Sequence, residues 1–165
     1  MEEGIYKMKR AYFDRKIKEQ IEACSYDFYI VNPIKDVKCT CVDIKTNQAE
    51  PKCINCLGTG YKISIKKIRG ASNEVLKNIS GKGGVRGSLA EAIVRNYFID
   101  KKYPVSEDAL IIDNNLVFYV YRIADMKGLE GVETHYEIQA NLKKNDHNVI
   151  LNNFKKIMEK YKNRR

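Results

Sequence analysis

Cysteine spacing constrains this chain more than any other feature. Four of the five cysteines lie in one short stretch, as Cys39-x-Cys41 and, eleven residues later, Cys53-x-x-Cys56. Four thiolates satisfy the tetrahedral coordination of structural zinc, and one hairpin can bring together two pairs this close in sequence. We therefore expect Cys39, Cys41, Cys53 and Cys56 to hold one structural Zn²⁺ in a zinc ribbon over residues 35–61. The metal would supply folding free energy to a module too small for its own core.

The second cysteine pair carries the sharper signal. Gly58 and Gly60 follow it and permit the tight turn in which backbone amides point at the sulfurs. The first pair is more closely spaced than usual, so four unligated cysteines are an alternative. A redox-active pair formed by Cys53 and Cys56 is a weaker alternative, because no thioredoxin-like βαβ pattern surrounds these two cysteines. Four thiolates leave no position for water, which predicts a structural metal and not a catalytic one.

The rest of the chain is predicted to be mainly β structure between two helices. Apolar residues at three- and four-residue steps predict amphipathic helices at 5–23 and, with strong basic character, at 146–165. Aromatic, β-branched or alternating stretches predict strands at 25–31, 61–68, 109–112, 117–123 and 134–142. Turns are expected at 32–33, 113–115 and 128–131, and a flexible glycine-rich loop at 79–88.

A short helix is expected after that loop, capped by Ser88 and running through residues 89–96. The chain has 165 residues, of which 44% are hydrophobic, and this is enough for one domain over residues 1–165. We expect an α+β, mainly β fold: a small β-barrel or sandwich with the zinc ribbon inserted into it.

The basic character of the chain invites a nucleic-acid role. The net charge is +9, and Lys66, Lys67, Lys82 and Arg86 are the candidate contacts to DNA or phosphate. The alternative is codon bias, because a sequence rich in Lys, Ile, Asn and Tyr and without Trp is what an AT-rich genome encodes. The glycine-rich loop lacks the pattern of a phosphate-binding loop, so a flexible surface loop is its simpler interpretation.

No constellation of catalytic residues can be placed in the sequence. His135 is expected on a strand face and His147 at a solvated helix start, and Asp108 and Asp113 are spaced as turn residues. We therefore predict no enzymatic activity. No apolar run approaches the length that crosses a bilayer, and residues 1–21 have no signal-peptide core. We expect a soluble protein made in a reducing compartment, without membrane contact.

Two resemblances add to these patterns. Residues 53–60, Cys-x-x-Cys-x-Gly-x-Gly, are similar to one repeat of the zinc domain of DnaJ chaperones, which carries four. The second resemblance rests on the order of the stretches YFID (97–100), YPVSED (103–108), IDNNLVFYV (112–120) and THYEIQA (134–140). This order is similar to that of the small β-barrel head-closure and head-to-tail connector proteins of tailed bacteriophages.

The phage resemblance implies a function. Such proteins form homo-oligomeric rings between portal and tail, line or plug the DNA channel, and catalyse nothing. The implied location is the virion neck, after synthesis in the host cytoplasm. The implied partners are further copies of the chain, the portal and tail or neighbouring neck proteins, and the DNA in the channel. The alternative is a zinc-ribbon nucleic-acid-binding accessory protein; a chaperone-like client binder rests on residues 53–60 alone.

Overall fold

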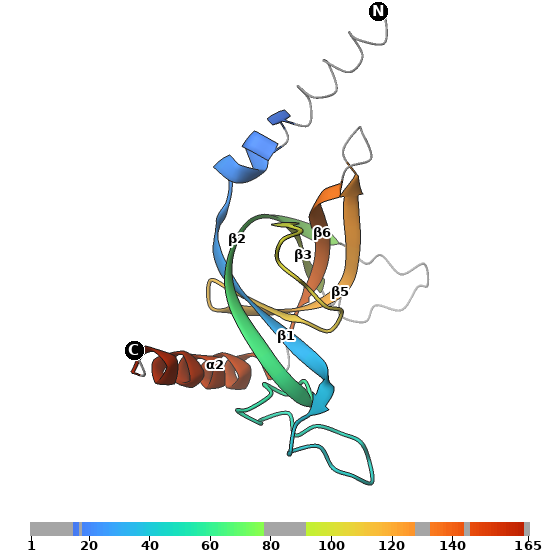
Figure 1. Ribbon diagram of the computed structural model, residues 1–165, viewed down its shortest axis with the longest axis vertical. Helices are drawn as coiled ribbons and strands as arrows, with labels where there is room; N and C mark the ends of the chain where they lie inside the picture. The colour runs from blue at the N-terminus through green and yellow to red at the C-terminus, as the bar shows by residue number, and fades with distance from the viewer. Residues whose placement is uncertain (1–14, 17, 78–91, 128–132, 144–145, 164–165) are drawn as a thin grey trace, which may run out of the picture.

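The computed structural model describes residues 15–16, 18–77, 92–127, 133–143 and 146–163. Six strands in this part of the chain form one closed antiparallel barrel in the order β1-β2-β3-β6-β5-β4 (Figure 1). The strands are β1 (Tyr26–Lys38), β2 (Tyr61–Lys77), β3 (Ala92–Asp100), β4 (Leu110–Asp113), β5 (Leu116–Lys127) and β6 (Glu133–Leu142). A helix precedes β1, and α2 (His147–Lys162) follows β6. The predicted α+β, mainly β fold with a helix toward each end is confirmed, and the sheet is a closed barrel.

Side chains fill the inside of the barrel, because every second residue of a barrel strand points inward. The largest buried side chains are Tyr97, Phe28 and Phe118, with ring centroids 5.0 Å apart for the first two and 5.9 Å apart for Tyr97 and Phe118. Gly70 of β2 lies against this core: a Cβ there would be 2.7 Å from the carbonyl oxygen of Phe98 and 3.2 Å from the Phe28 ring. The long strand β2 therefore passes the core where no side chain fits.

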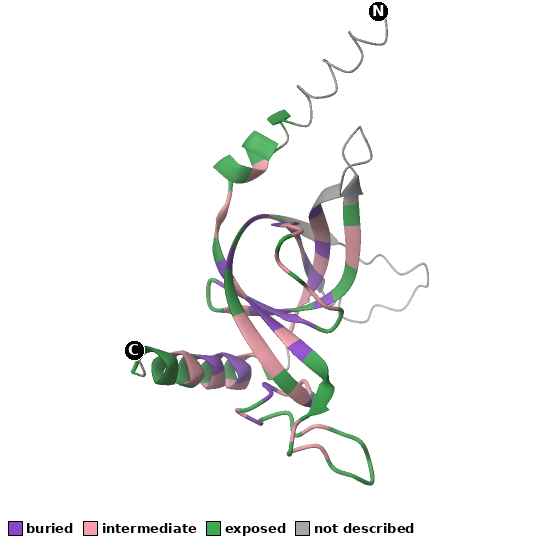
Figure 2. Cartoon of the chain, viewed as in Figure 1, coloured by how far each residue is buried: buried purple, intermediate pink, exposed green. Residues whose placement is uncertain are grey.

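The helix α2 covers one outer face of the barrel. Its residues Ile150, Leu151 and Phe154 are buried in a second hydrophobic cluster (Figure 2). The strand residues of this cluster are Val31, Leu110, Ile112 and Val117. All four residues of β4 are buried, since one face of the strand points into the barrel and the other lies under α2. The predicted amphipathic helix is confirmed, although Tyr161 on its apolar face is 58% exposed.

The turn predicted at residues 32–33 is wrong, because β1 continues through these residues to Lys38. In its last part the strand has lost β4 as a neighbour and pairs with β2 alone, so it is an edge there. Proline donates no ladder hydrogen bond, and an edge tolerates Pro33 for that reason. The Asn32 side chain turns to the β3–β4 connection, where its Nδ2 donates to the carbonyl oxygen of Pro104 at 2.8 Å.

The prediction of a short helix after Ser88 is wrong for residues 92–96, the part of that stretch that the structure describes. Residues 92–100 form β3, which pairs with β2 on one side and β6 on the other. Tyr97 and Ile99 point into the barrel, and Arg95 shares their face. Because Arg95 is charged but faces inward, the sequence of β3 does not show the alternation of apolar and polar residues that indicates a strand. The apolar residues of this stretch therefore suggest a helical period instead.

Two asparagines make the β4–β5 turn as predicted. Asn114 and Asn115 have φ values of 47° and 63°, the left-handed conformation that a two-residue type I′ turn requires. Asp113, predicted in the turn, is instead the last residue of β4 and buried.

Several expectations fall partly or wholly outside the described residues. The N-terminal helix predicted at 5–23 is helical over residues 15–16 and 18–23, and the remainder lies outside. The glycine-rich loop at 79–88, Ser88 itself and the turn at 128–131 also lie outside.

Candidate metal centre

The segment between β1 and β2 brings the four cysteines together. The sulfur atoms of Cys39, Cys41, Cys53 and Cys56 all lie within 4.8 Å of one another. The Cys41–Cys56 sulfurs are 3.5 Å apart and the Cys39–Cys53 sulfurs 3.8 Å apart. Metal–sulfur bonds of about 2.3 Å in a tetrahedron place the sulfurs about 3.8 Å from one another. The four thiols are thus spaced to hold one metal ion.

The second pair sits on a knuckle of left-handed residues. Leu57, Gly58 and Gly60 have φ values of 52°, 79° and 78°. The amide of Leu57 donates to the carbonyl oxygen of Cys53 at 2.9 Å and closes the turn. A Cβ on Gly58 would lie 3.0 Å from the carbonyl oxygen of Pro51, so both conformation and space favour glycine. Leu57 is fully buried in the α2 cluster, which fixes the knuckle to the barrel.

The first pair is held by the end of the barrel strand. The amide of Cys39 donates to the carbonyl oxygen of Gly60 at 2.9 Å, so the two ends of the segment are joined directly beside the sulfurs. The amide of Val42 donates to the carbonyl oxygen of Cys39 at 3.1 Å, which makes a tight turn around Cys41. This turn is how a pair with only one intervening residue directs both sulfurs to the same point.

Burial and nearby amides act in opposite directions on these thiols. Burial raises the pKa of the Cys41 thiol to about 12. Burial also raises the pKa of Cys56, while the backbone N–H groups of Gly60 and Gly58 pull it down. The backbone of Cys41 lowers the pKa of Cys39 by a hydrogen bond to its sulfur. As free thiols Cys41 and Cys56 resist ionisation, and a bound cation is the group that would offset the cost. The amides aimed at the Cys56 sulfur are those expected of a metal knuckle.

The candidate phosphate contacts do not join this centre. Lys66 and Lys67 are exposed neighbours on β2, and Lys67 pairs with Asp27 of β1, Nζ to Oδ2, at 2.8 Å. Lys82 and Arg86 lie outside the described residues. The structure thus places two of the four candidates on the barrel wall and brings neither to the cysteines.

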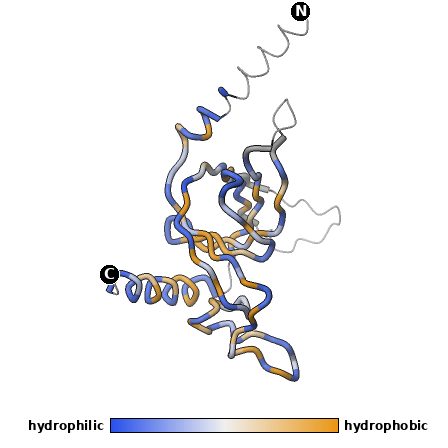
Figure 3. Tube along the Cα trace, viewed as in Figure 1, coloured by the Kyte–Doolittle hydropathy of each residue, from blue (hydrophilic) through white to orange (hydrophobic). Residues whose placement is uncertain are grey.

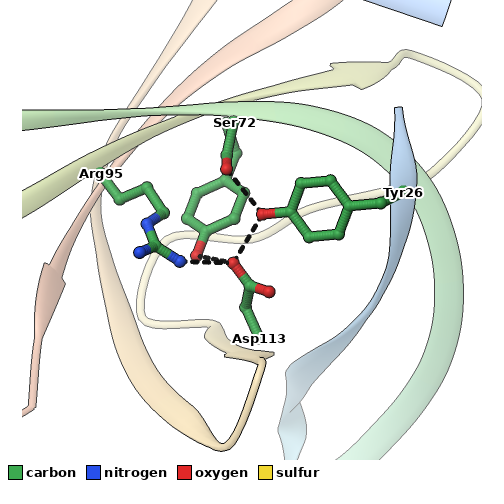
Figure 4. A network of polar contacts seen from close by, with 5 residues as sticks. Tyr26, Ser72, Arg95 and Asp113 are labelled. Atoms are coloured by element: carbon green, nitrogen blue, oxygen red, sulfur yellow. Dashed lines mark hydrogen bonds and ion pairs between the residues drawn. The ribbon is translucent and has the colours of Figure 1, made fainter. Parts of the chain in front are cut away.

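A buried polar cluster inside the barrel is not anticipated by the sequence patterns. The Oδ2 atom of Asp113 accepts hydrogen bonds from Tyr26 Oη at 2.7 Å, Tyr97 Oη at 3.1 Å and Arg95 Nη1 at 2.7 Å (Figure 4). The hydroxyl of Tyr26 also lies 2.6 Å from Ser72 Oγ. Strands β1, β3 and β4 therefore meet at one carboxylate, and β2 joins the cluster through the contact of Ser72 with Tyr26.

The cluster is an ion pair away from water. The side chains of Arg95 and Asp113 are 13% and 0% exposed, and the Arg95 guanidinium lies 4.8 Å from the centroid of the Phe118 ring. The other carboxylate oxygen, Oδ1, is buried without a hydrogen-bond partner among the described residues. Burial is the main cause that raises the pKa of Tyr97, and the nearby Asp113 carboxylate is the second. The same two causes raise the pKa of Tyr26. Both hydroxyls thus stay protonated as donors. The spacing of β4 contains a signal for this position. Asp113 lies two residues after Ile111, so the two-residue period of a strand places its side chain inside the barrel with that of Ile111.

The two histidines lie on the elements predicted for them. His147 is the first residue of α2 as predicted, but it is only partly solvated and accepts a hydrogen bond at Nδ1 from the amide of Val117 at 3.3 Å. His135 lies on β6 as predicted and is only 7% exposed. Burial lowers its pKa, and the Asp100 carboxylate partly opposes that effect.

The sequence matches no protein-family model, and no curated protein is significantly similar to it. Within the described residues, none of the helices has the length and apolar character needed to span a membrane.

Proposed function

We propose that this chain is a non-enzymatic structural protein of a tailed-bacteriophage neck, a head-to-tail connector that assembles with copies of itself into a ring. The observation that carries the proposal is the apolar surface of the arm, defined here as residues 34–60. Ile34, Val37 and Ile44 of the arm are 36%, 46% and 99% exposed. Apolar side chains exposed on a projection offer a partner apolar area to bury. A connector needs such surfaces because its work is to hold other subunits.

In this proposal Cys39, Cys41, Cys53 and Cys56 bind one Zn²⁺ that keeps the arm folded. The arm has little core of its own: within residues 39–60 the buried side chains are those of Cys53, Cys56 and Leu57. Metal binding then supplies the folding free energy that apolar burial does not. A folded arm presents its apolar residues in one geometry, so less conformational entropy is lost when a partner binds.

The proposed partners are further copies of this chain, the portal and tail or neighbouring neck proteins, and DNA passing through the ring. The protein would be made in the host cytoplasm and end in the virion neck. A ring of copies uses two different surfaces on each subunit. The outer loop of the arm and the exposed side of α2 lie apart and can serve as such surfaces (Figure 1).

Electron microscopy and mass photometry of the zinc-loaded full chain test the proposal. We expect closed rings whose mass is a multiple of 19.1 kDa, and loss of those rings when a chelator removes the metal. The matched control is the same sample with zinc restored, which should reassemble. A particle that stays a single chain at every concentration, and binds no portal or tail protein, contradicts the proposal.

A zinc-ribbon nucleic-acid binder is the second candidate. It is favoured by the exposed Lys62, Lys66 and Arg69 on β2. Such a protein would bind DNA or RNA as an isolated chain, and the logarithm of its affinity would fall linearly against the logarithm of salt concentration. Tight salt-sensitive binding without any rings would favour this candidate over the connector.

A further inference from the structure

The tip of the arm presents one isoleucine almost completely to solvent. Ile44 is 99% exposed, and the turn around it is closed by hydrogen bonds on both sides. The Oδ1 atom of Asp43 accepts from the amides of Lys45 at 2.7 Å and Thr46 at 2.9 Å, and the Asp43 amide donates to the carbonyl oxygen of Gln48 at 3.0 Å. The tip is therefore an ordered turn that carries an apolar knob.

A groove elsewhere on the chain has the opposite shape. It has a volume of about 340 Å³ and lies where the cysteine segment, β2 and the last turns of α2 meet. Its lining residues are Ile54, Asn55, Lys62, Ile63, Ile65, Ile157, Lys160 and Tyr161. Isoleucines make half of this lining, and Lys62 and Lys160 are exposed beside them. An apolar side chain accompanied by a negative charge fits such a groove.

The knob and the groove do not meet within one chain. The outer loop of the cysteine segment, with hydrophobic stretches in it, projects away from α2 (Figures 1 and 3). Asp43 directly precedes the knob in the sequence. Its negative charge complements the two lysines of the groove. One chain thus offers two different surfaces that match each other, which is the requirement for head-to-tail assembly.

We propose that Ile44 of one copy of this chain inserts into the groove between β2 and α2 of the next copy. The inference rests on the proposed ring-forming function and names the contact that would close the ring. Asp43 of the first copy lies against Lys62 and Lys160 of the second. The repeated contact is heterologous, so each copy gives a knob to one neighbour and a groove to the other.

Mixing two variants tests the contact in the full zinc-loaded chain. Ile44→Asp removes the knob and keeps the groove, whereas Lys160→Glu with Tyr161→Asp spoils the groove and keeps the knob. These residues are exposed, so the fold and the metal content should stay unchanged, and circular dichroism and metal analysis check this. Matched controls are Ile44→Val at the tip and Lys155→Glu on the exposed part of α2.

Mass photometry should show that each disrupting variant alone is monomeric, with the dissociation constant between copies raised about a hundredfold. The controls should assemble like the unchanged chain. An equimolar mixture of the two disrupting variants should form dimers and nothing larger, because one intact knob meets one intact groove and no others remain.

Three outcomes overturn the inference, and they are distinguishable from one another. If the unchanged chain forms rings and Ile44→Asp forms them equally well, the knob contact is wrong while the connector proposal stands. If both variants lose assembly but their mixture stays monomeric, the two surfaces do not contact each other. If the unchanged chain itself is monomeric and binds no neck component, the connector proposal fails and this contact fails with it.

Discussion

Replacing Asp113 by alanine should cost the barrel a large part of its stability. The change removes the acceptor of three hydrogen bonds, at 2.7, 2.7 and 3.1 Å, and breaks the ion pair with Arg95, whose side chain is 13% exposed. Breaking a buried ion pair by removing one partner costs about 3–5 kcal/mol. Whole domains have a free energy of unfolding of about 5–15 kcal/mol, so the loss is a major fraction.

Urea unfolding of the zinc-loaded protein, followed by circular dichroism, measures this cost. The matched control is Asp27→Ala, because the Asp27 side chain is 49% exposed and its pairing with Lys67 spans 2.8 Å at the surface. That control should change the free energy of unfolding far less, because exposed ion pairs contribute little. Tyr26→Phe should cost about 1–2 kcal/mol in the unchanged chain and less in the Asp113→Ala background, where only its Ser72 contact remains to lose.

Equal losses of stability in Asp113→Ala and Asp27→Ala would refute the role given to the buried ion pair. The reasoning is also refuted if Tyr26→Phe costs the same in both backgrounds, because the tyrosine and the carboxylate would then not be coupled. An Asp113→Asn variant separates charge from shape. It keeps an oxygen acceptor of similar size, so it should fall between the alanine variant and the unchanged chain.

Three further predictions concern the arm and the barrel end. Cys53→Ser should lower zinc affinity by more than about a hundredfold, since changing even a residue that only contacts a metal ligand costs about 10–100-fold. Competition with a chelator measures the affinity. The control is Cys24→Ser, which should have no effect because Cys24 is exposed and lies outside the cluster. Gly58→Ala should reduce the protection of the arm against proteolysis, because its φ of 79° and the 3.0 Å approach to Pro51 both oppose a Cβ. Burial lowers the pKa of His135 below its ordinary 6.5, so stability should fall as pH drops through 6.5 toward the folded-state pKa and then level off. His135→Gln should show a smaller fall between pH 7.5 and 5.5 in urea midpoints; an equal fall contradicts the assignment.

Local patterns predict the elements that depend on local chemistry. The Asn114-Asn115 turn, the alternating strand that begins at Tyr61 and the apolar face of α2 all follow from their own residues. The cysteine cluster was predictable for the same reason. Two sulfur pairs of short spacing restrict the chain before any tertiary contact is considered, and glycines at 58 and 60 supply the turn.

Long-range contacts explain what the sequence could not reveal. Arg95 looks like a surface residue until Asp113, from another strand, is placed beside it in the barrel. The strand predicted at residues 61–68 continues to Lys77, because its second half pairs with β3 from Gly70 to Lys77 and closes the wall. Pro33 suggests a strand end, and only the loss of β4 as a neighbour accounts for a strand that continues past it.

The account depends most on one ion holding the four clustered cysteines. Native mass spectrometry of the full chain, purified without chelator, tests this directly because it weighs the bound metal with the protein. The account predicts one zinc ion per chain, lost when Cys53 and Cys56 are both replaced by serine. Chains that carry no metal, or that carry the same metal after those replacements, would contradict it.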